Sequence, residues 1–243
     1  VGRNRLTVDR SGNGRMYGRT DIPEFSHIQG YEDHSVNFLA TYRPDGALSG
    51  LIVNIACPAQ AETSGRQVSA DFWHETRAEL RRRFGDELFI LPQLSAAGDQ
   101  DTNEPFEAKA ARRMARLAGR TSREEIAVRI ADAADRVLPL IQSEIDWRPI
   151  FIHRVEILEL PRLEPQPERP NLPVEVHALR LGDVGMVTNP FELFLDYGVQ
   201  IKGRSPAIQT FVVQLAGPGS YLPTSRAVKS GGYGATSGSR EVG

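Results

Sequence analysis

The chain has 243 residues, of which 29 are Lys or Arg and 31 are Asp or Glu, so its formal net charge is −2. This balance gives no electrostatic reason to expect a nucleic-acid or acidic-membrane partner. Hydrophobic residues make up 40% of the chain. No apolar run approaches the ~20 residues of a membrane-spanning helix, so no transmembrane segment is expected. The single cysteine, Cys57, excludes an intrachain disulfide and is expected to be a buried structural thiol.

The first half begins with a hairpin signal. Residues 35–41 and 47–56 are predicted as strands, and residues 43–46, Arg-Pro-Asp-Gly, supply the turn between them. The second strand is nearly continuously apolar, as expected for a central buried strand. A helix is predicted from Asp71 to Phe84, since Ser-Ala-Asp precedes it and Gly follows it.

A buried strand over residues 87–91 opens into a loop of small residues over 92–103. Small residues after such a strand let backbone amides approach a ligand closely. Asp99 and Asp101 project from this loop and are candidate binding residues. The alternative for both is solubility and local capping of the loop.

The middle of the chain is predicted to be helical and then extended. Amphipathic patterns indicate helices over residues 104–119 and 122–145, and alternating patterns indicate strands over 151–160 and 174–181. Five prolines over residues 161–173 predict an exposed extended connection, which is also the best candidate for a subdomain boundary. The whole pattern predicts an α/β fold, a mixed β-sheet core with flanking helices.

The last third carries a carboxylate and a phenol at the ends of two apolar strands. The strand over residues 184–188 leads to Asn-Pro-Phe and then Glu192, which is predicted in the first turn of a helix, where the dipole favours a negative charge. The strand over 208–215 ends in Ala-Gly-Pro-Gly and leads to Tyr221. Strand ends in α/β proteins commonly bind ligands. The alternatives are a helix-start charge for Glu192 and packing for Tyr221.

Five segments, in this order, resemble the neutral/alkaline (non-lysosomal) ceramidases, zinc-dependent amidases that cleave the N-acyl bond of ceramide. They are Asn4-Arg5, LIVNIACPAQ followed by VSADF over 51–72, LSAAGDQDTN over 94–103, Pro190-Phe191-Glu192, and Tyr221-Leu222-Pro223-Thr224. Tyr233 follows Tyr221 at the spacing that the family keeps. The resemblance implies that residues 1–243 are a single-domain fragment, the middle and end of a larger catalytic domain in a divergent bacterial member.

The resemblance also implies a Zn²⁺ ion and a set of site residues. These are Glu192 and Tyr221 as metal ligands, Arg5 or Tyr233 to stabilise the oxyanion, and Asp99 or Asp101 to orient or deprotonate water. At least one more ligand is expected from the family's earlier segment, which would precede Val1.

Two positions depart from the family. Pro58 stands near the family's strand-end histidine ligand, and Asp101 stands where the family has the serine to which catalysis is attributed. A carboxylate is a poor substitute for a hydroxyl nucleophile, although it could act as a general base or a metal ligand. His34 and His74 are the histidines that could replace the lost ligand, and the alternative is that both are structural.

The implied function is a zinc-dependent hydrolase that cleaves an amide (N-acyl) bond in a small amphipathic amide or lipid, which need not be ceramide. The competing hypothesis is a catalytically degenerate domain that binds lipid or protein. Pro58 and Asp101 favour the second hypothesis, whereas the spacing of Glu192, Tyr221 and Tyr233 favours the first. The resemblance is compatible with a secreted or periplasmic protein, but the sequence fixes neither the compartment nor the oligomeric state.

Overall fold

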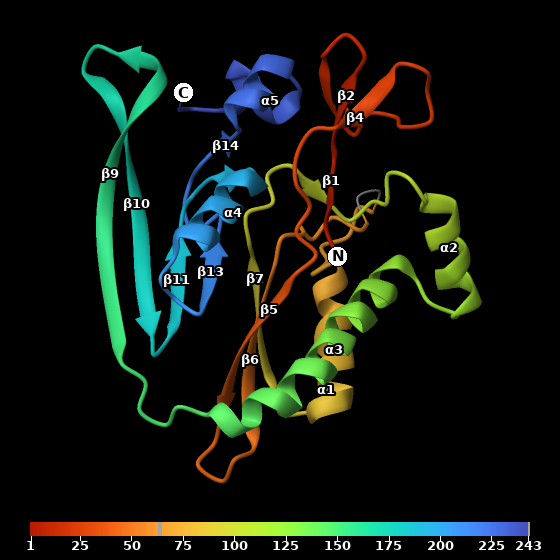
Figure 1. Cartoon of the computed structure of the whole chain (residues 1–243), viewed down its shortest axis with the longest axis vertical. Helices are drawn as coiled ribbons and strands as arrows, with labels where there is room; N and C mark the ends of the chain where they lie inside the picture. Colours follow the sequence, from red (N-terminus) through yellow and green to blue (C-terminus); the bar gives the residue numbers. More distant parts are fainter. Residues whose placement is uncertain (63–64, 243) are drawn as a thin grey trace. The chain divides into compact units, whose positions relative to one another are not determined.

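The computed structural model describes residues 1–62 and 65–242 (Figure 1). The chain forms two compact units. Unit 1 comprises Val1–Arg3, Asp33–Gln93 and Asp101–Trp147, and unit 2 comprises Asn4–Glu32, Leu94–Gln100 and Arg148–Gly243. Two very short strands, β1 (Arg3–Asn4) and β8 (Gln100–Asp101), lie where the chain passes from one unit to the other.

Unit 1 is built on a three-stranded sheet. Its order is β5 (Val36–Tyr42), β6 (Leu48–Ile55) and β7 (Phe89–Leu94), the last of which continues into unit 2. Strands β5 and β6 are antiparallel, and Phe38 is opposite Val53. Gly46 adopts a φ of 85° in the connecting turn, a conformation that glycine tolerates without strain. The predicted hairpin is therefore confirmed.

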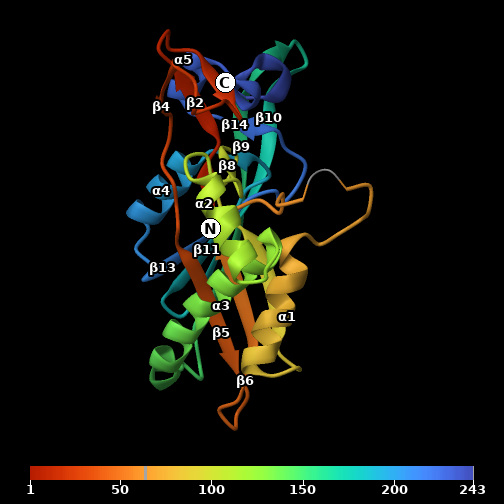
Figure 2. The same ribbon diagram turned by 90° about the vertical axis from the view of Figure 1, so that its right-hand side faces the viewer.

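Three helices complete unit 1, and two of them pack with its sheet. They are α1 (Phe72–Phe84), α2 (Ala108–Leu117) and α3 (Ser122–Ile141), and the short 3₁₀ turn η1 (Gln142–Glu144) follows α3. Asp71 caps α1 by accepting a hydrogen bond from the Phe72 amide at 2.7 Å. Helices α1 and α3 share a hydrophobic core with β5 and β6 (Figure 2). Cys57 is fully buried in this core, as expected, and burial raises the pKa of its thiol to about 12.

Unit 2 contains a four-stranded mixed sheet. Its order is β13 (Gln209–Val213), β11 (Val184–Thr188), β10 (Arg169–Leu181) and β9 (Phe151–Gln166). Strands β9 and β10 form a long antiparallel hairpin, β10 and β11 are antiparallel, and β11 and β13 are parallel. Helix α4 (Leu195–Arg204) lies between β11 and β13 in the chain.

The proline-rich residues 161–173 are not a connection between subdomains. They lie inside the β9–β10 hairpin, within unit 2, where Asn171 is opposite Pro161 and Pro173 is opposite Glu159. Prolines are tolerated at edge and irregular positions of a sheet, and the register of the two strands shifts between Arg169 and Asn171.

The rest of unit 2 consists of short elements. A three-stranded sheet has the order β3 (Gly14–Met16), β2 (Leu6–Asp9), β4 (Phe25–Ile28), and β12 (Glu192–Leu193) pairs with β14 (Tyr221–Leu222). Helix α5 (Ser225–Ser230) and the 3₁₀ turns η2 (Tyr233–Ala235) and η3 (Ser237–Ser239) follow. Together the two units confirm the predicted fold class, α/β with mixed sheets and flanking helices.

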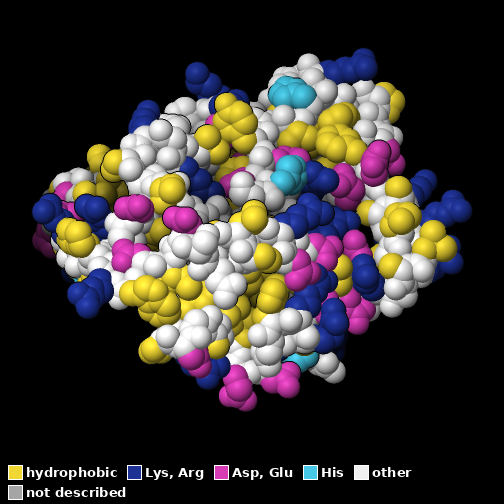
Figure 3. All heavy atoms as spheres, turned by 60° about the horizontal axis from the view of Figure 1, so that its bottom comes forward, with side chains coloured by type: hydrophobic (Ala, Val, Ile, Leu, Met, Phe, Trp, Pro, Cys, Tyr) yellow, Lys and Arg dark blue, Asp and Glu magenta, His cyan; other side chains and the backbone are white. Residues whose placement is uncertain are grey.

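The surface and the helices agree with the charge and hydropathy of the sequence. Acidic and basic side chains are interspersed over the face shown in Figure 3 rather than gathered by sign. Among the helices of residues 1–62 and 65–242, none is both long and apolar enough to span a membrane.

Candidate functional site

Unit 2 brings four of the predicted site residues together. Glu192 on β12 is aligned with Tyr221 on the parallel strand β14, and the Glu192 carboxylate is near enough to the Tyr221 hydroxyl to raise its pKa. The Tyr221 and Tyr233 rings meet edge to face, with centroids 5.7 Å apart. Arg5 Nη2 donates to the Tyr221 hydroxyl at 3.3 Å and to the Gly98 carbonyl at 3.0 Å. A cation, a carboxylate and two phenols therefore share one location.

Glu192 reaches this location from a strand and not from the predicted helix turn. Its amide donates to the Ser220 carbonyl at 2.9 Å, and the Phe194 amide donates to the Leu222 carbonyl at 3.1 Å. These two amides are therefore hydrogen-bonded in the pairing of β12 with β14 and do not belong to a helix. Helix α4 begins only at Leu195.

Close backbone packing holds Glu192 against the loop that precedes Asp99. A Cβ atom on Gly98 would lie 2.4 Å from the Glu192 carbonyl oxygen, a distance that side chains do not tolerate. The buried Gln214 side chain joins the same elements, since its Oε1 accepts from the Ala97 amide at 2.9 Å and from the Leu193 amide at 3.1 Å. The position of Glu192 thus depends on glycine at position 98.

Gly98→Ala is expected to lower the free energy of unfolding by about 2 kcal/mol, because the clash is with backbone atoms that cannot rotate away. Urea unfolding measures this loss. Gly203→Ala is the matched control: it lies in α4 with open space around it, so it should be neutral or stabilising by up to about 1 kcal/mol. Equal losses in the two variants would contradict the close-contact argument.

Tyr17 is a site residue that the sequence analysis missed. It hydrogen-bonds Arg5 Nη1 through its hydroxyl, its ring centroid lies 5.1 Å from the Arg5 guanidinium carbon, and its amide donates to the Arg5 carbonyl at 2.8 Å. Its φ of 59° is a conformation that a tyrosine rarely adopts. Nothing in the sequence around Tyr17 indicates this conformation; only the glycines nearby suggest a turn. The strained backbone places the phenol beside the Arg5 guanidinium.

Asp99 is buried beneath this cluster and is engaged on both carboxylate oxygens. Oδ1 accepts from the Leu195 amide at 2.9 Å and from Gln100 Nε2 at 3.1 Å, and Oδ2 accepts from Asn4 Nδ2 at 2.9 Å. The residue is 2% exposed. Burial raises the pKa of its carboxyl group, and the Leu195 and Gln100 donors oppose this rise. The geometry favours a positioning role for Asp99 over the predicted catalytic one.

Burial also determines the protonation of Tyr221. Burial, followed by the hydrogen bond and the negative charge of Glu192, raises the pKa of Tyr221 to about 12. The Arg5 guanidinium acts in the opposite direction. Tyr221 is therefore a neutral phenol at physiological pH, and its hydroxyl accepts a hydrogen bond from Arg5.

Glu192 and Tyr221 are residue types that can bind zinc, but two ligands are too few for a catalytic zinc site. They offer two neighbouring oxygen donors, whereas a catalytic zinc site uses about three protein ligands. Within residues 1–62 and 65–242, no three or more His, Cys, Asp or Glu side chains are grouped so as to hold a metal ion. Glu192 and Tyr221 do not by themselves complete a zinc site.

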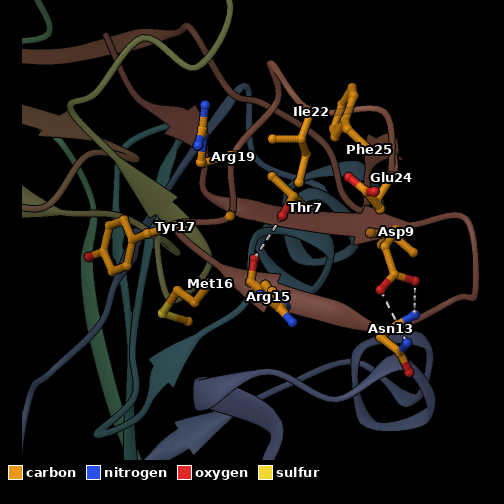
Figure 4. Close-up of a pocket in the computed structure, with 12 residues that line it drawn as sticks. Thr7, Asp9, Asn13, Arg15, Met16, Tyr17, Arg19, Ile22, Glu24 and Phe25 are labelled. Atoms are coloured by element: carbon orange, nitrogen blue, oxygen red, sulfur yellow. Dashed lines mark hydrogen bonds between the residues drawn. The ribbon is translucent and has the colours of Figure 1, made fainter.

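A pocket adjoins the cluster at Tyr17. Its volume is about 540 Å³. Figure 4 shows Tyr17 and Met16 at one end of it and Asp9 and Asn13 at the other. Strands β2 and β3 and the loop that leads to β4 form its walls. Since Tyr17 lines the pocket and also hydrogen-bonds Arg5, the pocket lies next to the candidate site.

Asp101 belongs to unit 1, where its carboxylate accepts hydrogen bonds from residues of its own loop. Oδ1 accepts from the Thr102 amide at 2.7 Å, and Oδ2 accepts from Asn103 Nδ2 at 2.8 Å. These contacts match the loop-capping alternative. A catalytic role for Asp101 stays a prediction.

The other altered position and the two candidate histidines also belong to unit 1. Pro58 follows the buried end of β6, and His74 is exposed on α1. His34 Nε2 lies 2.9 Å from Arg3 Nη1. Neither histidine belongs to the unit that carries Glu192 and Tyr221, and a metal role for either stays a prediction.

Comparison with known proteins shows the fold but not the family. No family model matches the sequence, and no curated protein sequence matches it. The structure is similar to that of neutral ceramidase from Pseudomonas aeruginosa, with a TM-score of 0.66 and 12% identity over 100% of this chain and 48% of that one. It is also similar to a ceramidase complexed with C2, with a TM-score of 0.67 and 12% identity over 100% of this chain and 50% of that one.

The chain thus spans about half the length of these two ceramidases. At 12% identity the likeness shows a shared ceramidase fold, which confirms the fold that the sequence resemblance implied. Activity, substrate and metal do not follow from a shared fold, because one fold hosts many functions.

Proposed function

We propose that this chain is part of a ceramidase-like hydrolase that cleaves an amide (N-acyl) bond with the help of Zn²⁺. The observation that carries the proposal is the contact of Arg5, Glu192, Tyr221 and Tyr233 in unit 2 of a ceramidase fold. The substrate class is a small amphipathic amide or lipid, either ceramide or a shorter N-acyl compound.

The chain's own residues have separate roles in this proposal. Glu192 and Tyr221 would hold the metal together with a further ligand, and the bound ion would polarise the amide carbonyl and lower the pKa of water. Arg5 is oriented by the Gly98 carbonyl, so its guanidinium is preorganised for the oxyanion that develops on the substrate. Tyr233 is 65% exposed, so its hydroxyl can donate a hydrogen bond to the same oxyanion.

Zinc content and hydrolysis test the proposal together. The purified protein, in the longest form of the polypeptide that can be expressed, should contain stoichiometric zinc by elemental analysis. It should hydrolyse N-acyl substrates of graded chain length, and a chelator should abolish this activity. If the purified protein contains no zinc and shows no chelator-sensitive hydrolysis, the proposed hydrolase function is excluded.

Glu192→Ala should lower zinc occupancy severalfold, because it removes one of the two neighbouring oxygen donors. Glu168→Ala is the control: it removes an exposed carboxylate of the same unit and should leave zinc content unchanged. Unchanged zinc in Glu192→Ala would remove this residue from the ligand set.

The alternative is a catalytically degenerate module that binds lipid or protein. The loop-capping contacts of Asp101 favour it, since the position where the family has its serine serves loop structure here. This alternative predicts binding of N-acyl lipids in vesicle sedimentation without hydrolysis and without zinc.

A further inference from the structure

Strand β9 is the edge strand of the unit 2 sheet, and only part of its outer edge is covered. On the outer side Arg162 pairs with Val242, and the Leu163 amide donates to the Glu241 carbonyl at 2.8 Å. Residues 151–160 precede this covered part and pair only with β10 in the part of the chain that the structure describes. Figure 1 shows β9 as the outer strand of the long hairpin. Its free N–H and C=O groups can pair with another strand.

The uncovered segment also exposes apolar side chains on both of its faces. Exposed fractions are 64% for Phe151, 43% for Ile152, 46% for Val155, 55% for Ile157 and 44% for Leu158. Lysine and proline are residues that commonly protect an edge strand from pairing, and residues 151–160 contain neither. This edge is therefore suited to accept a strand and not to repel one.

We propose that a second copy of this chain docks here, by antiparallel pairing of the two β9 strands around a two-fold axis at Val155. Arg154 then lies opposite Glu156 of the partner subunit, and Glu156 opposite the partner's Arg154. Ile152 lies opposite Leu158 of the partner subunit in the same way. Paired residues on neighbouring antiparallel strands are close enough for ion pairs and apolar contacts.

Repulsion between like charges disfavours the two neighbouring registers of the β9–β9 pairing. An axis at Arg154 would place two arginines opposite each other, and an axis at Glu156 would place two glutamates opposite each other, both of which are destabilising. In the described residues Arg154 and Glu156 make no ion pair or side-chain hydrogen bond within the chain. Both charges are therefore available to a second copy. The paired segment, 151–159, also ends before the edge covered by Glu241 and Val242.

Sedimentation equilibrium of the purified protein over a range of concentrations tests this dimer. The wild type is expected to dimerise reversibly. Arg154→Glu and Glu156→Arg should each weaken the dimer about tenfold, because each places two like-charged pairs across the axis. The double variant R154E/E156R restores opposite charges and should return the dissociation constant to near its wild-type value.

Circular dichroism establishes that each variant is folded, and Arg113→Glu on α2 is the charge-reversal control, which should leave dimerisation unchanged. A wild type that stays monomeric at all concentrations would overturn the proposal, as when another segment of a longer polypeptide covers β9. So would a dimer that is insensitive to both single reversals, or a double variant that does not recover.

Discussion

Arg5→Lys is expected to lower the kcat/KM of amide hydrolysis by about 10²–10³-fold, the usual cost of losing an oxyanion donor. Arg5 contacts the Gly98 carbonyl, the Tyr221 hydroxyl and the Tyr17 hydroxyl at once. A lysine ammonium carries the same charge but lacks the planar fork that makes these contacts together. The loss would therefore come from geometry and not from charge.

Two further variants separate geometry from general damage. Arg82→Lys is the matched control: Arg82 is exposed on α1 of unit 1 and pairs with Glu79, so hydrolysis should be unchanged. Tyr17→Phe keeps the ring over the guanidinium and removes the hydroxyl, so we expect a smaller loss of about tenfold. Full activity in Arg5→Lys would show that Arg5 has no role beyond structure.

Asp99→Ala is expected to lower the free energy of unfolding by about 3–5 kcal/mol. The substitution leaves the Leu195 amide without its acceptor. It also removes one of the two acceptors of Asn4 Nδ2 and of Gln100 Nε2, which keep the Tyr31 carbonyl. A buried donor without a partner costs about 1–3 kcal/mol. Urea unfolding measures the loss, and Asp45→Ala, an exposed turn residue, is the control with an expected loss below about 1 kcal/mol.

Asp99→Asn should be intermediate, for a specific reason. The amide oxygen can still accept from the Leu195 amide, but its NH₂ group would face Asn4 Nδ2, another donor. Asn4 cannot turn over without loss, because its Oδ1 accepts from the Leu6 amide at 2.9 Å. A loss in Asp99→Asn as large as in Asp99→Ala would show that the carboxylate charge itself is required.

The raised pKa of Asp99 makes this stability difference depend on pH. The folded protein binds the Asp99 proton more tightly than the unfolded chain, whose carboxyl titrates near its usual 3.8. The stability from this proton is fully present below that value and is lost as pH rises through the folded-state pKa. The deficit of Asp99→Asn relative to wild type should thus be largest in acid and should shrink as pH rises. A deficit that grew with pH would contradict the raised pKa.

Local patterns predicted those parts of the fold that depend on local forces. The Pro-Asp-Gly turn predicted the β5–β6 hairpin, because its backbone preference acts within four residues. Glu192 was misplaced in a helix because Pro190 favours a helix start, whereas the partner that makes it a strand, Tyr221, is 29 positions away in the chain. Pairing between distant segments overrode the local preference.

The candidate site was predictable only where the family resemblance marked it. Arg5, Glu192, Tyr221 and Tyr233 were predicted this way, and the structure brings them together. Tyr17 was not found, because its role depends on a left-handed backbone conformation that has no sequence signature in a tyrosine. The positioning role of Asp99 was also hidden, since it depends on burial.

Three separate stretches of the chain build unit 2, and the hydrogen bond from Arg5 to Tyr221 spans 216 positions. Contacts of such long range form slowly, because the entropy of closing the intervening loop must be overcome first. During synthesis from the N-terminus, Arg5 and Asp99 are made long before the residues that complete their surroundings. A nascent chain that stops before Tyr221 would expose a cation and an acid that the finished protein buries, and chaperones or proteases would meet that intermediate.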